Sequence, residues 1–334
     1  MSMSVTCAGC GLSYAGGRGL KGLLAQPRRA FDARFVRLLT EVPRFHRAAR
    51  ALLDEPDGID PTWGEFLAAQ GFSRYFVHHF AVPLVSCVWS SGDADAAAYP
   101  ARHLFRFLHH HGMLAVTGAP TWRTVVGGSA TYVERLAARL PDVRRGTPVT
   151  AVSRHSAGVE VRTAAGHTET FDRVVVATHA DQALDLLVDA TPEEKADLGA
   201  ITYSVNHTVL HRDAGLLPAA RGARACWNHR LRSCHETAGQ VTVSYWMNLL
   251  QGLQDDQDHV VTLNAADLVD PASVTATTTY EHPVFTHAAV EAAARLRTAG
   301  GPRLAFAGAH LGWGFHEDGC RSGVEAAESF GVTW

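Results

Sequence analysis

The sequence predicts an α/β chain in which two regions interleave, and three observations support this prediction. Apolar residues recur at three- and four-residue spacing through most of residues 1–140, as in amphipathic helices. Between Thr147 and Thr178 the spacing changes to two, as in strands. Further strand patterns follow, and the chain closes on a helix, a strand and a last helix. This order indicates two regions whose segments alternate along the chain.

The first part contains four segments with helical periodicity, residues 33–53, 62–70, 72–89 and 101–111. Pro43 and Pro83 fall inside two of them, and we expect a kink or a break at each, because proline lacks an N–H and clashes with the preceding turn. The triplet His109-His110-His111 suits the C-terminal end of a helix dipole. Consecutive side chains on a helix point in different directions, so we expect no three-ligand metal site there.

The strand patterns begin with a run joined by turns, residues 147–155, 158–166, 167–171 and 172–178. The last of these is nearly all apolar, which predicts a strand buried on both faces. Three more strand patterns cover residues 206–212, 241–248 and 259–264. The chain then closes on a helix, a strand and a final helix, over residues 286–299, 303–308 and 319–331.

Composition limits the class of protein. The chain has 334 residues, 46% of them hydrophobic and 19% charged, and these values are typical of a globular protein. A formal net charge of −3 gives no reason to expect a nucleic acid partner. No secretory pattern opens the chain, and the most apolar run, residues 75–89, is too short to span a bilayer. We therefore expect a cytoplasmic protein with no transmembrane segment and with its six cysteines reduced.

The stretch GGRGLKGL contains Gly17-x-Gly19-x-x-Gly22, the spacing of a dinucleotide-binding fingerprint. A functional fingerprint directly follows a buried strand and opens a long helix, with an acid about 20 positions on. Here the nearest upstream strand pattern is not adjacent, Pro27 stops any helix after about one turn, and Glu41 lies inside a helical pattern. We interpret these glycines as a turn-rich loop.

The C-terminal stretch is more informative. A strand pattern ends at Gly308, a loop rich in glycine and aromatic residues follows, and a helix pattern begins near Asp318 and Gly319. Gly319 and Gly323 leave one face of that helix start without side chains, so free N–H groups and the positive dipole end would meet an anionic group. A flavin suits this place, because its reduced ring carries negative charge near N1. An ordinary surface helix with two packing glycines explains the same pattern.

A second glycine pair lies in TWRTVVGGSATYVERLAARL, residues 121–140. Val125 and Val126 end an extended piece, and the two glycines that follow allow close approach of another backbone. We expect Ser129 to cap the next helix. The tripeptide Gly-Gly-Ser by itself occurs in many loops.

Together these segments resemble the flavin-containing amine oxidoreductase family, which includes amine oxidases, phytoene desaturases and protoporphyrinogen oxidases. The likeness is greatest to its bacterial branch of predicted NAD/FAD-binding proteins and covers nearly the whole chain. The segments that carry it are WRTVVGGSATYVERLA, FDRVVVATHADQALDLL, VTVSYWMNLLQGL, TYEHPVF and GWGFHEDGCRSGVEAAE. The resemblance implies an α/β, glutathione-reductase-like FAD-binding fold, incomplete here, with an interleaved α+β substrate domain.

The resemblance also implies FAD as cofactor and a set of residues that would hold it. The pair of glycines with Ser129 would lie beside the flavin, and the strand around Val149 would back the adenine side. The strand ends would face the ribityl–pyrophosphate region, and the start of the last helix would meet the ring. The implied cofactor-binding residues are Gly127, Gly128, Ser129, Val149, Ala177, Thr178, Gly308, Ala309, Asp318 and Gly319. Candidates for the flavin pocket, with no proton-transfer role assigned, are Trp246, His282, Trp313 and His316.

Members of this family begin with a strand–GxGxxG–helix–strand unit that ends in an acid. The chain as given starts at MSMSVTC, a pattern that suits the family's substrate region. We therefore expect the fingerprint unit upstream of Met1, so that this chain is N-terminally truncated. On the same basis we expect a mostly helical substrate region, part of the FAD-binding domain, a β-rich substrate region and a C-terminal FAD-binding segment, over residues 1–120, 121–200, 201–300 and 301–334.

Cys7 and Cys10 have CxxC spacing, which suits a metal or redox pair. No second CxxC exists, and the spacing of Cys226 and Cys234 is too loose to complete a site. The sequence by itself therefore predicts no metal site.

The function that these observations favour is an FAD-dependent oxidoreductase of the amine oxidase or desaturase kind. Its flavin would accept hydride from a C–H bond of a small amine or of an unsaturated or acyl substrate. The alternative is a non-catalytic remnant, a binding or scaffold module that no longer holds cofactor. A third and much weaker alternative is a His/Cys metal protein. A small-molecule substrate is the expected partner, and the sequence assigns no oligomeric state.

Overall fold

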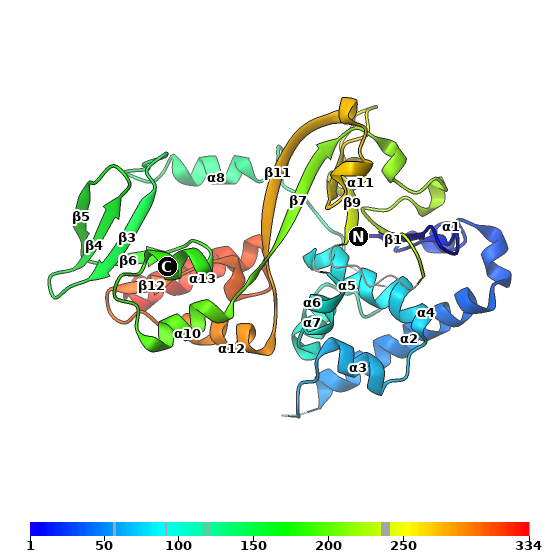
Figure 1. The fold of residues 1–334 in the computed structure, drawn as a ribbon, viewed down its shortest axis with the longest axis horizontal. Helices are drawn as coiled ribbons and strands as arrows, with labels where there is room; N and C mark the ends of the chain where they lie inside the picture. The colour runs from blue at the N-terminus through cyan, green and yellow to red at the C-terminus, as the bar shows by residue number, and fades with distance from the viewer. Residues whose placement is uncertain (56–57, 91, 116–117, 119, 235–240, 334) are drawn as a thin grey trace. The chain divides into compact units, whose positions relative to one another are not determined.

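The structure is a computed structural model that describes residues 1–55, 58–90, 92–115, 118, 120–234 and 241–333. The chain forms two compact units, each built from two segments that alternate along the sequence (Figure 1). Unit 1 comprises Met1–Arg123 and Ser204–His282, and unit 2 comprises Thr124–Tyr203 and Pro283–Trp334. The last change of unit comes at residue 282 and not near 300, because helix α12 (His287–Leu296) packs against helix α10 (Pro192–Ala200) within unit 2. The α/β class is confirmed.

Unit 1 is organised around a seven-stranded sheet of order β11-β7-β10-β9-β8-β1-β2. Its strands are β1 (Met3–Cys7), β2 (Ser13–Gly16), β7 (Tyr203–His211), β8 (Trp227–Leu231), β9 (Thr242–Trp246), β10 (Val260–Leu263) and β11 (Val274–Pro283). β1 runs parallel to β8, with Met3 opposite Trp227, so the two sequence segments of unit 1 pair directly. β8 and β11 are strands that the sequence patterns did not predict.

Helices pack beside this sheet, and α5 contacts both β1 and β8 (Figure 1). The helices of unit 1 are α1 (Gly19–Leu23), α2 (Ala33–Asp54), α3 (Trp63–Ala69), α4 (Arg74–Phe76), α5 (Val82–Trp89), α6 (Asp93–Ala97), α7 (Ala101–His110) and α11 (Met247–Gln251), with a π-helical turn at Val77–Ala81. Phe45 on α2 lies at the centre of their core, with the rings of Trp63, Phe76 and Phe105 at centroid distances of 5.6 to 6.2 Å. Edge-to-face rings at such distances add to the free energy gained by burying them.

The prolines do not break their helices. Pro43 lies inside the continuous 22-residue helix α2, and Pro83 lies in the first turn of α5. α5 directly continues the π-helical turn Val77–Ala81, so the helical run is irregular just before Pro83, as such turns and prolines make it. For Pro43, packing of the α2 residues Phe35, Leu38 and Phe45 keeps the helix together despite the lost hydrogen bond. The expected break at Pro43 is therefore wrong.

Unit 2 contains a three-stranded antiparallel meander and a two-stranded parallel sheet. The meander is β3 (Val149–Arg154), β4 (Val159–Thr163) and β5 (Thr168–Phe171), and the parallel pair is β6 (Val174–Val176) and β12 (Leu304–Phe306). The remaining helices are α8 (Ala130–Ala137), α9 (Ala180–Leu186) and α13 (His316–Ser329). One core, which includes Val176, Leu198 and Leu296, joins the parallel pair to α9, α10 and α12.

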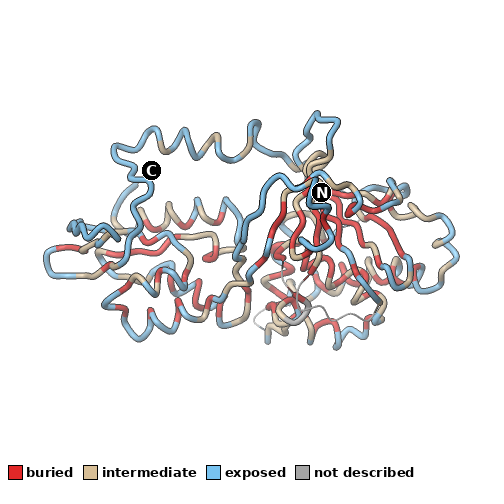
Figure 2. Tube along the Cα trace, turned by 45° about the horizontal axis from the view of Figure 1, so that its top comes forward, coloured by how far each residue is buried: buried red, intermediate tan, exposed pale blue. Residues whose placement is uncertain are grey.

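Two parts of unit 2 are more exposed than the sequence suggests. No residue of α8 is buried, as Figure 2 also shows. Val175 in β6 is 40% exposed, so the expectation of a strand buried on both faces is wrong. β6 pairs with β12 and with no other strand of the described residues, and this leaves one edge of β6 without a neighbour. None of the helices described is both long and apolar enough to cross a membrane.

Candidate functional site

Six of the implied cofactor-binding residues lie where the parallel strands of unit 2 end and α13 begins. Ala177 and Thr178 follow β6, and Gly308 and Ala309 follow β12. The two strand ends are adjacent, since the Ala307 N–H donates to the Val176 carbonyl at 3.0 Å. The carboxyl ends of parallel strands are where open α/β sheets bind ligands.

Helix α13 begins two residues earlier than the sequence pattern indicates, at His316 and not near Asp318–Gly319. The reason is a capping contact, because the Asp318 carboxylate accepts the Phe315 N–H at 3.1 Å and pairs with Arg321 at 2.6 Å. Asp318 is thus buried, and its carboxylate points back at the loop. Its expected place at the helix end against the flavin ring stays a prediction. The first-turn N–H groups, which have no acceptor within a helix, are those of His316, Glu317 and Asp318.

Gly319 adjoins the end of β12 and has room beside it. A Cβ built there would lie 3.8 Å from the Ala309 nitrogen and 3.9 Å from its Cβ, which are ordinary contact distances. The protein itself therefore does not require glycine at this position. Gly308 is different, because its added Cβ would lie 2.3 Å from the His310 ring.

Sequence reasoning missed Ser322 and His310, which hold this corner together. The Ser322 hydroxyl accepts the Gly308 N–H at 2.8 Å and donates to the Gly319 carbonyl at 2.8 Å, so it joins the strand end to α13. His310 is buried next to Ala309, and burial together with the nearby His179 lowers its pKa to about 4. Its imidazole is therefore neutral at pH 7. The only signal in the sequence for this joining role is the position of Ser322, one helical turn after Gly319.

The glycine pair precedes α8 as expected, but Ser129 does not cap it. Gly127 and Gly128 have φ values of +81° and +85°, which favour glycine. Ser129 occupies the N-cap position, yet its side chain makes no capping hydrogen bond. Val149 opens β3 and is 37% exposed. One contact brings α8 to the start of α13, where the Tyr132 hydroxyl and His316 Nδ1 lie 2.6 Å apart.

The four pocket candidates divide between the units. Trp313 and His316 lie in unit 2, at the start of α13, whereas Trp246 and His282 lie in unit 1. Trp246 on β9 and His282 on β11 lie level with opposite ends of β7. Trp246 and His211 both pair with Val260, and Ser204 at the other end donates to the His282 carbonyl.

Seven residues of strand separate those positions by about 20 Å, so the two side chains do not line one pocket. Trp246 instead donates to Asp258 at 2.7 Å, and His282 contacts the Asn206 amide at 3.0 Å.

The other glycine and cysteine motifs lie in unit 1. Gly17 directly follows β2, and Gly19 and Gly22 lie in the five-residue helix α1, which ends at Leu23. A 3₁₀ turn then begins at Pro27. β2 is an antiparallel edge strand, so these residues form no strand–helix–strand unit. Cys7 ends β1, and Cys10 lies in the turn between β1 and β2. These two cysteines come close to Cys234 and His79 but not to Cys226.

Comparisons with known proteins agree with this architecture. The family model of flavin-containing amine oxidoreductases matches residues 14–329. A search of curated proteins finds no match. Three similar solved structures are a putrescine oxidase variant (12% identity, TM-score 0.66, 99% of this chain and 81% of that one), the CLA-producing fatty acid isomerase from P. acnes (15%, 0.63, 99% and 80%) and cyclohexylamine oxidase from Brevibacterium oxydans IH-35A (14%, 0.61, 98% and 80%).

The matched range spans almost the whole chain, and the solved structures share its fold over nearly all of its length. The chain therefore belongs to the family of flavin-containing amine oxidoreductases.

Proposed function

We propose that this protein is an FAD-dependent oxidoreductase that oxidises a C–H bond of a small amine or of an unsaturated or acyl substrate. The observation that carries the proposal is the corner of unit 2 where β6, β12 and the start of α13 meet. The family assignment supports a flavin there, and the titles of the similar structures, two amine oxidases and a fatty acid isomerase, supply the two substrate classes.

The donors of this corner fit an anionic, planar group. The N–H groups of the first turn of α13 carry the positive end of the helix dipole, and the 14-residue helix is long enough to develop that dipole. Gly319 adds no side chain, although the protein has room for one, and this would leave space for a ligand. When bound, FAD accepts the hydride that leaves the substrate carbon.

The chain's own residues would position that group and stabilise its charge. Ser322 keeps the end of β12 against α13, and Asp318 fixes where the helix begins. First-turn N–H groups would offset negative charge on a reduced cofactor. His310, neutral and buried beneath Ala309, adds no positive charge to the corner at pH 7.

A second candidate is the non-catalytic module. The free edge of β6 and the lack of buried residues in α8 favour it, because among the described residues no glycine-rich strand–helix unit adjoins β6 to cradle a pyrophosphate. Under this alternative the chain folds and does not bind FAD.

Titration of the purified chain with FAD separates the two candidates. Under the first, flavin fluorescence is quenched with a saturable dissociation constant, and Gly319→Val weakens binding at least about tenfold because its side chain occupies the ligand space. The matched control is Cys320→Val, the next residue of the same helix, whose side chain is exposed and lies off the face that Gly319 and Gly323 share.

Equal losses in both variants would contradict the proposed site. Absence of FAD binding both by this chain and by a chain extended with an N-terminal fingerprint unit would favour the non-catalytic module. Where FAD binds, dye reduction with primary amines and with unsaturated fatty acids assigns the substrate class.

A further inference from the structure

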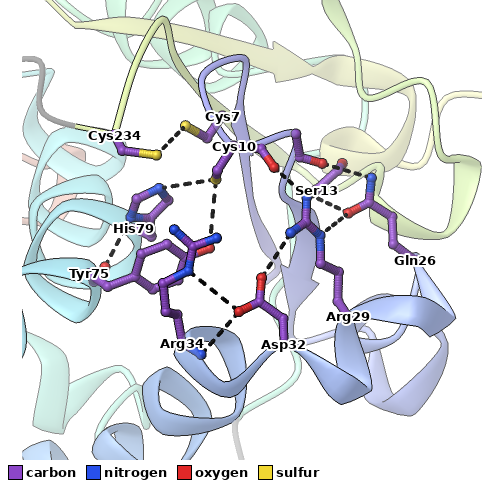
Figure 3. Close-up of polar contacts among 11 residues, drawn as sticks. Cys7, Cys10, Ser13, Gln26, Arg29, Asp32, Arg34, Tyr75, His79 and Cys234 are labelled. Atoms are coloured by element: carbon purple, nitrogen blue, oxygen red, sulfur yellow. Dashed lines mark hydrogen bonds and ion pairs between the residues drawn. The ribbon is translucent and has the colours of Figure 1, made fainter.

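Four side chains of types that bind metals converge in unit 1, whereas the corner proposed to hold the flavin belongs to unit 2. Cys7, Cys10, His79 and Cys234 each direct one ligand atom to a common point, and these atoms all lie within 4.8 Å of one another. The Cys7 and Cys234 sulfurs are 3.7 Å apart, and the Cys10 sulfur is 3.7 Å from His79 Nε2 (Figure 3). Cys7 and His79 are buried, while Cys10 and Cys234 are half-buried.

These separations fit a single tetrahedral ion. Thiolate sulfurs about 2.3 Å from a tetrahedral zinc ion lie about 3.8 Å from each other. An iron–sulfur cluster spreads its four ligands over two or more iron atoms, so some of the ligand atoms lie farther apart than the 4.8 Å that limits this group. A disulfide brings two sulfurs to about 2 Å, and all six cysteines of this chain are free. The spacing thus matches one mononuclear ion.

The Cys7–Cys10 turn is shaped to present two sulfurs on one side. The Cys7 N–H donates to the Leu12 carbonyl at 2.8 Å, which closes the turn. Gly11 takes a φ of +67°, which favours glycine. Gly9 lets the turn approach Cys234, since a Cβ there would lie 3.0 Å from the Cys234 nitrogen.

His79 is held with its ligand nitrogen toward the sulfurs. Its Nδ1 lies 3.0 Å from the Tyr75 carbonyl, so Nδ1 carries the proton and the Nε2 lone pair faces Cys10. A histidine that binds metal through one nitrogen and donates to a backbone carbonyl through the other is the usual arrangement. The Tyr75 ring stacks on the imidazole at 4.0 Å, and the π-helical turn Val77–Ala81 carries the residue.

We propose that Cys7, Cys10, His79 and Cys234 bind one Zn²⁺ ion, which joins the β1–β2 turn and the turn after β8 to the helical layer. Three thiolates and one imidazole are a closed ligand set of the structural type, with no position left for substrate. The four ligands and Zn²⁺ together carry one negative charge, and the Arg29 guanidinium lies against this turn, donating to the Cys10 carbonyl. This site departs from the sequence-based expectation of no metal.

The test is the metal content of the full chain, purified without added metal and measured by plasma mass spectrometry. We expect about one zinc ion per chain in the wild type and less than a tenth of that in Cys234→Ser, because three remaining ligands hold zinc far more weakly. Cys226→Ser is the matched control. Cys226 is a buried cysteine that immediately precedes β8, its sulfur accepts a hydrogen bond from the Ser2 hydroxyl, and its loss should leave zinc unchanged.

Cobalt substitution keeps the test decisive if a cysteine variant fails to fold. Wild-type protein loaded with Co²⁺ should show the visible bands of a tetrahedral ion and a near-ultraviolet thiolate band. In Cys10→Ser that band should fall in proportion to the loss of one of three thiolates. An octahedral cobalt spectrum, iron in place of zinc, or metal-free wild type with a Cys7–Cys234 disulfide would each overturn the proposal.

Discussion

His310 links the candidate site to pH. Its pKa of about 4 lies below the ordinary value of 6.5 because the imidazole is buried and faces His179, while Asp181 acts in the opposite direction. Between these pH values the unfolded chain binds a proton that the folded chain does not. The stability that His310 contributes is therefore complete above pH 6.5 and declines as the pH falls toward 4.

We predict that His310→Gln flattens this decline. The decrease in the free energy of unfolding between pH 6.5 and pH 5, measured by urea denaturation, should be smaller than in the wild type by about 1.5 kcal/mol. His167, exposed in the turn between β4 and β5, is the control, because its ring meets solvent in both states. If His310→Gln and His167→Gln give the same slope as the wild type, His310 is not a buried neutral histidine.

At the scale of elements, one ion-pair group joins β3 to the start of α10. The Arg154 guanidinium binds both oxygens of Glu194, at 2.6 and 2.7 Å, and its Nε binds Asp189 at 2.9 Å. Glu194 also completes a capping box with Thr191 and is 4% exposed. A buried carboxylate that loses its cation destabilises a protein more than the loss of an exposed pair does.

Arg154→Met should therefore lower the free energy of unfolding by about 2–4 kcal/mol, near the value for breaking a buried pair. Arg162→Met breaks the exposed pair with Glu160 and should change stability by less than about 1 kcal/mol. Urea denaturation of both variants compares the two. Similar small losses would mean that water stabilises Glu194 as well as Arg154 does.

At the scale of the whole molecule, the two units have separate cores. The aromatic core around Phe45 belongs to unit 1, and the core around Val176 and Leu296 belongs to unit 2. The proposed zinc ion stabilises only unit 1, and Arg154 stabilises only unit 2. A ligand or contact that exists in one folded unit raises the melting temperature of that unit.

We predict two calorimetric transitions that respond to different changes. A zinc chelator should lower one melting temperature by several degrees, and Arg154→Met should lower the other. Applied to Cys234→Ser, the chelator should have no further effect. One transition that both changes lower together would show that the units unfold as a single cooperative body.

Local pattern was enough to predict many elements. The strands β3 to β6, helix α12 and helix α13 follow from apolar spacing and turn residues, since each element depends on neighbours within a few positions. The end of α7 before Gly112, which has a φ of +66°, also follows from local chemistry. Capping contacts moved boundaries by a few residues, as Asp318 does for α13.

The sequence by itself determined the α/β class, the family likeness and the corner where Gly308, Ala309 and Gly319 meet, because these depend on order and short spacing along the chain. Only the tertiary structure decided which strand lies beside β1 and which side chains join Cys7 and Cys10. Cys7 and Cys234 are separated by 227 positions, and Cys10 and His79 by 69. No local spacing encodes such contacts. They arise because β1 pairs with β8 and α5 packs on both strands, so burial of apolar surface brings distant ligands to one point.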